Sequence, residues 1–228
     1  MRWQAAIFDL DGVLADSAVL HYAAWKRLAD DLSIPFDPAA NEPLKGVDRM
    51  RSLRLLLARG GRSASEAEML AMADTKNLYY RDLIETVTPG DLLPGVEPLL
   101  AQASAAALAL AVASASRNAA ALLQKLGIAD RFDFVADAGA IANPKPAPDI
   151  FLACAHALAV EPARCIGFED AAAGIEAILA ARMLAIGIGD PLALAGAHRI
   201  YPTPAAIDLA AILALSGVPQ DQMGRQHG

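Results

Sequence analysis

The stretch AAIFDLDGVLADS, residues 5–17, decides the fold that the rest of the chain must fit. An apolar run at its start leads directly into Asp9 and Asp11, which are one residue apart and are followed by a glycine. A short run without polar alternation is typical of a strand that is covered on both faces of a sheet. Charged groups are costly to place beside such a strand, so the sequence predicts that both carboxylates have a chemical task.

Similar apolar runs recur along the chain, and helical patterns separate them. The strand-like runs are WQAAIFD, LALAVAS, FDFVAD, RCIGFED and MLAIGIG, and the helical patterns cover Val96–Ala105, Asn118–Leu126, Pro148–Leu158 and Ala172–Ala181. This alternation predicts an α/β fold with a doubly wound parallel sheet. Ligands of such sheets bind beyond the carboxyl ends of the strands, where the strand order reverses.

Residues 17–90 interrupt the alternation with helical patterns alone, among them a Ser65/Glu68 spacing that resembles a capping box. The sequence therefore predicts a helical cap at 17–90, inserted into a core made of 1–16 and 91–228. The cap holds 10 Lys and Arg residues against 10 Asp and Glu residues, so the remainder carries the whole net charge of −7. A neutral segment rich in cations beside an acidic one would suit an anion held between the two.

Composition narrows the classes of function. With 228 residues, 55% of them hydrophobic, the chain can bury a sizeable core, and its net charge of −7 argues against nucleic acid as a partner. Cys154 and Cys165 form no Cys-x-x-Cys pair and fit buried fillers in a reducing cytoplasm. The run LLAQASAAALALAVASAS is roughly long enough to span a membrane, but Gln102 and the serines favour a helix followed by a strand. We expect a cytoplasmic protein with no membrane partner.

Asp9 and Asp11 are the first candidates for chemistry. An aspartate at a strand end can attack a phosphorus or carbon centre and form a covalent intermediate. A second carboxyl two residues later could reach the attacking or leaving oxygen as a general acid or base. The D-L-D-G order lacks the ligand spacing of an EF-hand loop. Alone, the pair is equally compatible with a turn before glycine.

Three further segments hold candidate groups near strand ends. Glu169 and Asp170 follow an apolar strand and could hold Mg²⁺ together with Asp9, or simply cap the next helix. Ser114 ends another strand, where a hydroxyl and free backbone N–H groups make an anion site or a helix cap. Lys145 lies in the proline-rich NPKPAPD segment, which would hold it as a fixed positive charge for a phosphoryl group.

The order of these features resembles the haloacid dehalogenase superfamily of phosphotransferases, and the resemblance covers the whole chain. In that superfamily, an acid two residues after the nucleophile distinguishes phosphatases and mutases from dehalogenases and ion-pumping ATPases, so Asp11 indicates the former. The match is closer to its hexose-phosphate mutases, on the segments FDLDGVLADSAVLHYAAW, NEPLKGVDRM, TKN, ASASRN, KPAPDIF and GFEDAAAGIEAI.

The resemblance implies a role for each site residue. Asp9 is phosphorylated and Asp11 shuttles the proton of a sugar hydroxyl. Mg²⁺ is held by Asp9, the backbone carbonyl of Asp11 and Asp170, with Glu169 close by. The transferring phosphoryl is held by Ser114, the Ala115 backbone and Lys145, and the other phosphate by Arg49, Ser116, Arg117 and Asn118. Contacts to the sugar, or between cap and core, come from His21, Lys45, Gly46, Ser52 and Lys76, while Trp25 fits a wall of the ligand site and the cap core equally well.

The implied reaction converts β-D-glucose 1-phosphate to glucose 6-phosphate through an aspartyl phosphate and a bound bisphosphate. Two alternatives remain: a sugar-phosphate phosphatase of the same fold, and a catalytically silent regulator that binds sugar phosphates. The chain departs from the mutase pattern at Arg117, where lysine is usual, at Ser17, which replaces threonine, and at Ala171, which replaces serine. We expect a monomer, because the cap of the same chain covers the site.

Overall fold

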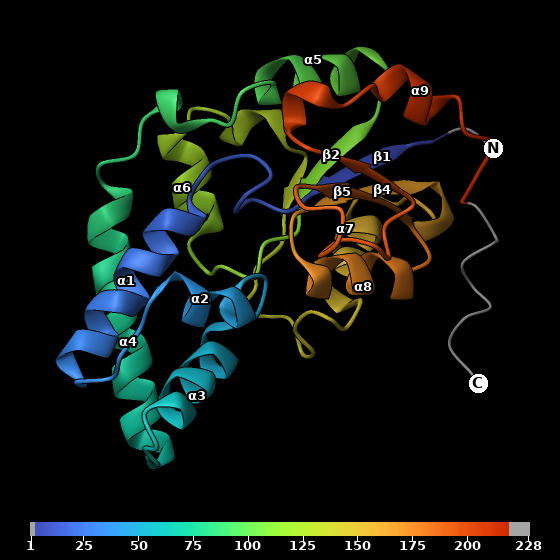
Figure 1. The fold of residues 1–228 in the computed structure, drawn as a ribbon. Helices are drawn as coiled ribbons and strands as arrows, with labels where there is room; N and C mark the ends of the chain where they lie inside the picture. The colour runs from blue at the N-terminus through green and yellow to red at the C-terminus, as the bar shows by residue number, and fades with distance from the viewer. Residues whose placement is uncertain (1–2, 219–228) are drawn as a thin grey trace, which may run out of the picture.

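The computed structural model describes residues 3–218 and shows a parallel sheet with helices on both faces and a helical cap to one side (Figure 1). The strands are β1 (Ala5–Phe8), β2 (Ala109–Val112), β3 (Phe134–Val135), β4 (Cys165–Glu169), β5 (Leu184–Ile188) and β6 (Arg199–Tyr201). Their order in the sheet is β3-β2-β1-β4-β5-β6, and each neighbouring pair is parallel. The predicted doubly wound α/β fold is confirmed.

Seven of the helices between residues 3 and 218 follow the sequence patterns closely, and the short helices α2 and α9 were not predicted. The helices are α1 (Ala18–Asp31), α2 (Pro38–Asn41), α3 (Arg49–Arg59), α4 (Glu66–Ile84), α5 (Val96–Ala105), α6 (Ala119–Lys125), α7 (Asp149–Ala157), α8 (Ala172–Ala180) and α9 (Leu209–Leu213). Short 3₁₀ turns lie at Glu42–Leu44, Pro89–Asp91, Ala129–Arg131, Pro162–Arg164 and Pro204–Ala206. Strand β6 was not predicted, because it has three residues and begins with an exposed arginine.

The central strand β1 supplies side chains to both faces of the sheet. Ala6 and Phe8 belong to the cluster that includes residues of α5, α6 and α9, whereas Ala5 and Ile7 belong to the cluster beneath α7 and α8. The ring of Phe8 stacks on Phe168 of β4 with 4.6 Å between the ring centroids. Both faces of β1 are therefore covered, which explains why its sequence is apolar without interruption, as predicted.

The strand order reverses at β1, which pairs with β2 on one side and β4 on the other. Phe8 lies opposite Val112 in β2 and opposite Phe168 in β4, so the three strands end at nearly the same level. Because the strands are parallel, the residues that follow them meet at one edge of the sheet. Asp9, Ser114 and the Glu169–Asp170 pair therefore come together.

The cap has an apolar core of its own, formed by α1, α2, α3 and α4. This cluster contains Trp25, Leu28, Leu53, Leu56 and Ala73 and is separate from the two clusters that flank the sheet. The predicted capping box at the start of α4 is present: Glu68 N donates to Ser65 Oγ at 3.3 Å, and Ser65 N donates to the Glu68 carboxylate at 2.8 Å.

The chain enters and leaves the cap through two adjacent segments. Leu93 N donates a hydrogen bond to Leu14 O at 3.0 Å, and Ala15 forms an antiparallel bridge with Leu92. We therefore retain the division into a cap at 17–90 and a core at 1–16 and 91–228 as a proposal. Residues 219–228 of that core lie outside the described residues.

The cysteines lie in the core of the sheet domain. Cys154 and Cys165 are both buried and unbonded to each other, and burial raises the pKa of each thiol to about 12. Both act as small apolar side chains, as the sequence suggested. Within residues 3–218, no helix is both long and apolar enough to cross a membrane.

Candidate active site

A cavity of about 330 Å³ lies between the cap and the carboxyl ends of the strands. Most residues singled out from the sequence line it: Asp9, Asp11, His21, Trp25, Lys45, Gly46, Arg49, Ser52, Lys76, Ala115, Ser116, Arg117, Asn118 and Asp170. The remaining three, Ser114, Lys145 and Glu169, are buried behind this wall. The structure therefore gathers in one place residues that are as many as 161 positions apart in the chain.

Lys145 joins two buried carboxylates beneath the cavity floor. Its Nζ atom lies 2.6 Å from Asp9 Oδ1 and 2.8 Å from Glu169 Oε2, and its side chain is 1% exposed. Burial alone would lower the pKa of Lys145, but the charges of Asp9 and Glu169 hold it above its ordinary value. Lys145 is therefore a fixed positive charge beside the candidate nucleophile.

Three carboxylates meet beside this lysine. Asp9, Glu169 and Asp170 each offer an oxygen atom, and these atoms lie within 4.8 Å of one another. Burial, and then the charges of Glu169 and Asp9, raise the pKa of Asp170 well above its ordinary value. One ammonium cannot offset three carboxylates, and the donor set consists of oxygens, so the cluster fits a hard divalent cation. The Asp11 carboxyl is not part of this cluster, and the proposed role of its backbone carbonyl stays a prediction.

Two glycines make room for these carboxylates. A Cβ atom on Gly174, in the first turn of α8, would overlap the carboxyl group of Glu169. A Cβ atom on Gly12 would overlap the carboxyl group of Asp170, and Gly12 has a φ of +80°, which favours glycine. Both the left-handed backbone and the nearby Asp170 carboxyl group therefore explain why a glycine follows Asp9 and Asp11.

Asp11 faces the cavity and has its own set of partners. Ser17 Oγ donates to Asp11 Oδ1 at 2.5 Å, and His21 Nε2 lies 3.6 Å from Asp11 Oδ2. Burial, with the nearby Asp9 carboxylate second, raises the pKa of Asp11 to about 6. A carboxyl group with a pKa near neutrality can both accept and return a proton, as a general acid/base must.

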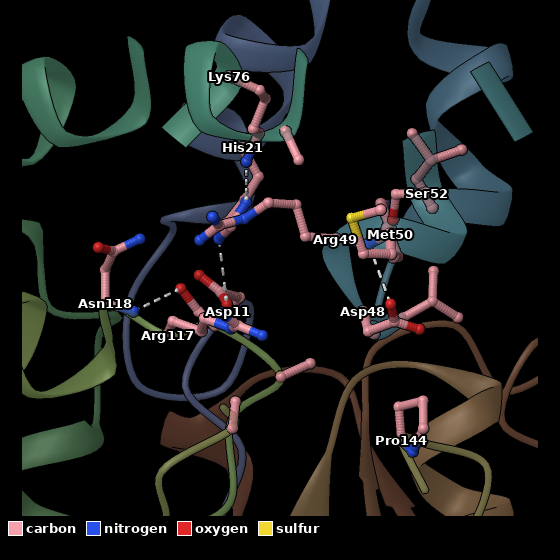
Figure 2. A pocket seen from close by; sticks show the side chains of 18 of the residues that line it. Asp11, His21, Asp48, Arg49, Met50, Ser52, Lys76, Arg117, Asn118 and Pro144 are labelled. Atoms are coloured by element: carbon pink, nitrogen blue, oxygen red, sulfur yellow. Dashed lines mark hydrogen bonds and ion pairs between the residues drawn. The ribbon is translucent and has the colours of Figure 1, made fainter. Parts of the chain in front are cut away.

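A short chain of side chains from the cap ends at Asp11 (Figure 2). Lys76 Nζ lies 2.8 Å from His21 Nδ1, so an ammonium there donates to Nδ1 and leaves the ring proton on Nε2. Burial, then Lys76 and Arg49, lower the pKa of His21 well below its ordinary value. A neutral His21 therefore presents its Nε2–H toward the Asp11 carboxylate.

Two arginines line the cavity itself, whereas Lys145 is buried behind its wall. Arg49 reaches from α3 toward the segment that carries Arg117 and Asn118 (Figure 2). Burial, followed by the charge of Arg117, lowers the pKa of Arg49. Within residues 3–218 neither arginine forms an ion pair. The charge of Asp74 acts on Arg49 in the opposite sense, as a smaller effect. Two guanidinium groups that repel each other and form no ion pair favour a bound anion between them.

The other predicted site residues make local hydrogen bonds or ion pairs, or line the cavity. Ser116 N donates to Ser114 Oγ at 3.1 Å, and Asn118 N donates to Ser116 Oγ at 3.3 Å, which shapes the turn before α6. Lys45 pairs with Glu42 at 2.9 Å on the cavity rim. Trp25 lines the cavity and also packs in the cap core, so both of its alternatives hold in part. Ser52 is buried and faces the cavity. The roles assigned to them from the resemblance stay predictions.

Two asparagines in this region were not singled out from the sequence. Asn41 is 8% exposed and lines the cavity, and its side-chain amide has no hydrogen-bond partner within residues 3–218. Asn77 lies in the quoted TKN segment and accepts hydrogen bonds from Arg49 and Asn118. Both belong to segments that carried the resemblance, and a polar residue within such a segment was the available signal.

Comparison with known proteins agrees with this site. The haloacid dehalogenase-like hydrolase family matches residues 3–182. A β-phosphoglucomutase of Bacillus subtilis (strain 168) is 45% identical over 199 residues, which cover 86% of this chain and 88% of the relative. A fructose-1-phosphate phosphatase of Escherichia coli (strain K12) is 32% identical over 188 residues, which cover 82% of this chain and 97% of that protein.

The chain also resembles a solved structure of the same family of relatives. The crystal structure of a β-phosphoglucomutase from Clostridium difficile superposes with a TM-score of 0.90 at 45% identity, covering 92% of this chain and 95% of the other. The match extends over the sheet, the flanking helices and the cap. The chain belongs to the haloacid dehalogenase-like hydrolase family.

Proposed function

We propose that the protein is a Mg²⁺-dependent β-phosphoglucomutase, which converts β-D-glucose 1-phosphate to glucose 6-phosphate through β-glucose 1,6-bisphosphate. The observation that carries this proposal is that cations lie at two places around one cavity, one buried behind its wall and the other lining it. Lys145 lies beside Asp9, whereas Arg49 and Arg117 face each other at a separate place. A bisphosphate needs a cation at each end, and a mutase must hold it in both orientations.

The residues next to Asp9 suit phosphoryl transfer. An oxygen of the Asp9 carboxylate attacks phosphorus and forms an acyl phosphate, while the bond to the sugar oxygen breaks. Lys145 stays within hydrogen-bond distance of Asp9 and offsets the charge of the phosphoryl group. Asp9, the backbone carbonyl of Asp11 and Asp170, with Glu169 close by, would hold Mg²⁺, which supplies further positive charge for the transferring group when bound.

Asp11 acts as the general acid and base for the sugar hydroxyl. When the phosphoryl group passes to Asp9, its bond to the sugar oxygen breaks and Asp11 donates a proton to that oxygen. When a sugar hydroxyl attacks the phosphorus of the phosphoaspartate, Asp11 accepts the hydroxyl proton and the Asp9 carboxylate leaves. Ser17 holds one oxygen of the Asp11 carboxyl by a hydrogen bond, and His21 Nε2 lies 3.6 Å from the other oxygen without bonding to it. Because Lys76 and His21 belong to the cap, closure of the cap completes this arrangement.

We further propose that the protein acts as a cytoplasmic monomer. The cavity wall is formed by the core and the cap of the same chain, so no second copy is needed to complete the site. Two free buried thiols suit a reducing compartment.

A coupled assay tests the activity. The protein is supplied with β-glucose 1-phosphate, Mg²⁺ and a trace of the bisphosphate, and glucose 6-phosphate and free phosphate are measured together. A mutase yields mainly glucose 6-phosphate. Mainly free phosphate would establish the phosphatase alternative, which the similarity to a fructose-1-phosphate phosphatase keeps in view. If neither product formed, the regulator alternative would take precedence.

The variant Arg49→Ala tests the distal site directly. Loss of a hydrogen bond to a charged group costs about 1.5–3 kcal/mol, so kcat/KM for β-glucose 1-phosphate should fall by roughly 10- to 150-fold. Hydrolysis of acetyl phosphate, which has no distal phosphate, should fall much less. Arg54→Ala, an exposed arginine on the same helix, is the matched control. A parallel loss of both activities would assign Arg49 to cap folding instead.

A further inference from the structure

Asn77 links the cap to the core at a single oxygen atom. Arg49 Nη2 donates to Asn77 Oδ1 at 2.9 Å, and Asn118 Nδ2 donates to the same oxygen at 2.9 Å. Asn77 lies on α4 and Arg49 on α3, both in the cap, whereas Asn118 precedes α6 in the core. Asn77 itself does not line the cavity, but both of its donors do.

We propose that Asn77 is a positioning residue that holds Arg49 and Asn118 in place for the distal phosphate. The inference rests on the proposed function, because it assigns these two side chains to the phosphate remote from Asp9. Asn77 acts through its two neighbours and touches no ligand.

The donor count supports a positioning role. A carbonyl oxygen has two lone pairs, and the two hydrogen bonds occupy both on Asn77 Oδ1. A guanidinium has five N–H donors and an amide NH₂ has two, so Arg49 and Asn118 each keep donors free after bonding to Asn77. Because both side chains line the cavity, an arriving phosphate meets donors that are already oriented.

The charge of the acceptor also matters. Arg49 and Arg117 repel each other, and neither forms an ion pair within residues 3–218; the charge of Asp74 offsets only part of the effect on Arg49. A neutral amide restrains Arg49 against this repulsion and leaves its positive charge for the ligand. A carboxylate at position 77 would restrain Arg49 equally well but would offset that charge.

The first test is Asn77→Ala, with Thr75→Ala on the same helix as the control. Alanine is a better helix former than asparagine, so the substitution does not weaken α4 by propensity. Among residues 3–218, the Thr75 side chain bonds only to Ala71 O of its own helix. We expect the KM for β-glucose 1-phosphate to rise roughly 5- to 20-fold with kcat changed by less than about threefold, and the KM for acetyl phosphate to rise less. A fall in kcat alone, or an equal effect of Thr75→Ala, would overturn the inference.

A double-variant comparison then asks whether Asn77 acts through Arg49. In an Arg49→Ala background, Asn77→Ala should raise the KM by less than about twofold, because the side chain that it orients is already gone. Asn77→Asp should retain the order of Arg49 and Asn118 but still raise the KM. Additive effects of the Ala variants would contradict the proposal.

A readout without substrate separates this inference from the proposed function. In NMR spectra of the ligand-free protein, the side-chain NH₂ signals of Asn118 should move toward solvent-exposed values in Asn77→Ala and stay near their wild-type positions in Thr75→Ala. Unchanged Asn118 signals would overturn the positioning role whatever the substrate is. If the signals move but the wild type does not convert glucose phosphates, the proposed function fails and the positioning of Arg49 and Asn118 stands.

Discussion

Gly46 of the cap lies so close to Ala171 of the core that a Cβ atom added to Gly46 would sit 2.9 Å from the Cβ of Ala171. Gly46 also has a φ of +69°. Ala171 directly follows Asp170, so this contact brings the cap against the core beside the carboxylate cluster. A side chain at position 46 would hold the two parts of the molecule slightly apart.

Gly46→Ala should therefore impair closure of the cap. With water less well excluded, more of the phosphoaspartate should hydrolyse, and the ratio of free phosphate to glucose 6-phosphate should rise. Gly61→Ala is a matched control, since Gly61 has a φ of +60° but no atom within 4 Å of an added Cβ. Both variants should lose about 1–2 kcal/mol of stability from the left-handed backbone, and only Gly46→Ala should change the product ratio. If the two variants gave the same ratio of free phosphate to glucose 6-phosphate, the contact between Gly46 and Ala171 would not be needed for closure of the cap.

Lys145→Met should destabilise the fold strongly. Lys145 is 1% exposed and bonds to Asp9 and Glu169, so its removal leaves buried carboxylates without their counter-ion. Breaking a buried pair in this way typically costs about 3–5 kcal/mol of unfolding free energy. Urea unfolding at pH 7 measures this loss of unfolding free energy. Lys125→Met is the control: it removes an exposed ion pair with Glu85 and should cost about 0–1 kcal/mol. Equal losses in the two variants would contradict the account.

Ala171→Ser should stabilise helix α8. Ala171 is the N-cap of α8 and has the extended backbone of a cap, with φ −119° and ψ 144°, but its methyl group cannot accept a hydrogen bond. Serine at an N-cap is worth about 0.5–2 kcal/mol relative to alanine. Ala172→Ser, one residue inside the helix, should give no such gain. If Ala171→Ser lowered the urea midpoint instead, the hydroxyl would be crowding Gly46.

Lys76 should make stability depend on pH. Burial, and then the charge of Arg49, lower its pKa from 10.5 to about 7 in the folded protein. Between those two values the unfolded chain binds more protons than the folded one, so this contribution to stability rises as the pH increases from about 7 to about 10.5. In Lys76→Met the rise in unfolding free energy from pH 7 to pH 9 should be smaller than in wild type. Lys26→Met, at an exposed lysine, should retain the wild-type slope.

Most of the fold could be predicted because its strands are apolar throughout and its helices are periodic. The pattern over Val96–Ala105 matches α5 at both ends, and the ranges predicted for α6, α7 and α8 agree within one residue at each end. The short helix α9 was not predicted. Strand β6 was not predicted, because it lies at the edge of the sheet and has only three residues, the first of which is Arg199. So short a segment has no recognisable apolar pattern.

The site could be predicted only as far as motifs reach. Asp9 and Asp11 stand out from their position after a strand, but the contact of Lys145 with Glu169 depends on how the loop that carries Lys145 folds against the end of β4. The link from Asn77 to Asn118 spans 41 positions and two parts of the molecule. A polar residue on a helix is by default solvated, so no spacing in the sequence could reveal that link.

Gly174 bears on how substitutions in this protein should be interpreted. Alanine in place of a helical glycine normally gains stability, by about 1 kcal/mol. Here the added methyl group would push the Glu169 carboxylate away from Lys145 and from the carboxylate cluster. A deep mutational scan for activity should record position 174 as intolerant although Gly174 does not line the cavity. Libraries intended to alter the sugar preference of this scaffold should therefore keep that codon fixed.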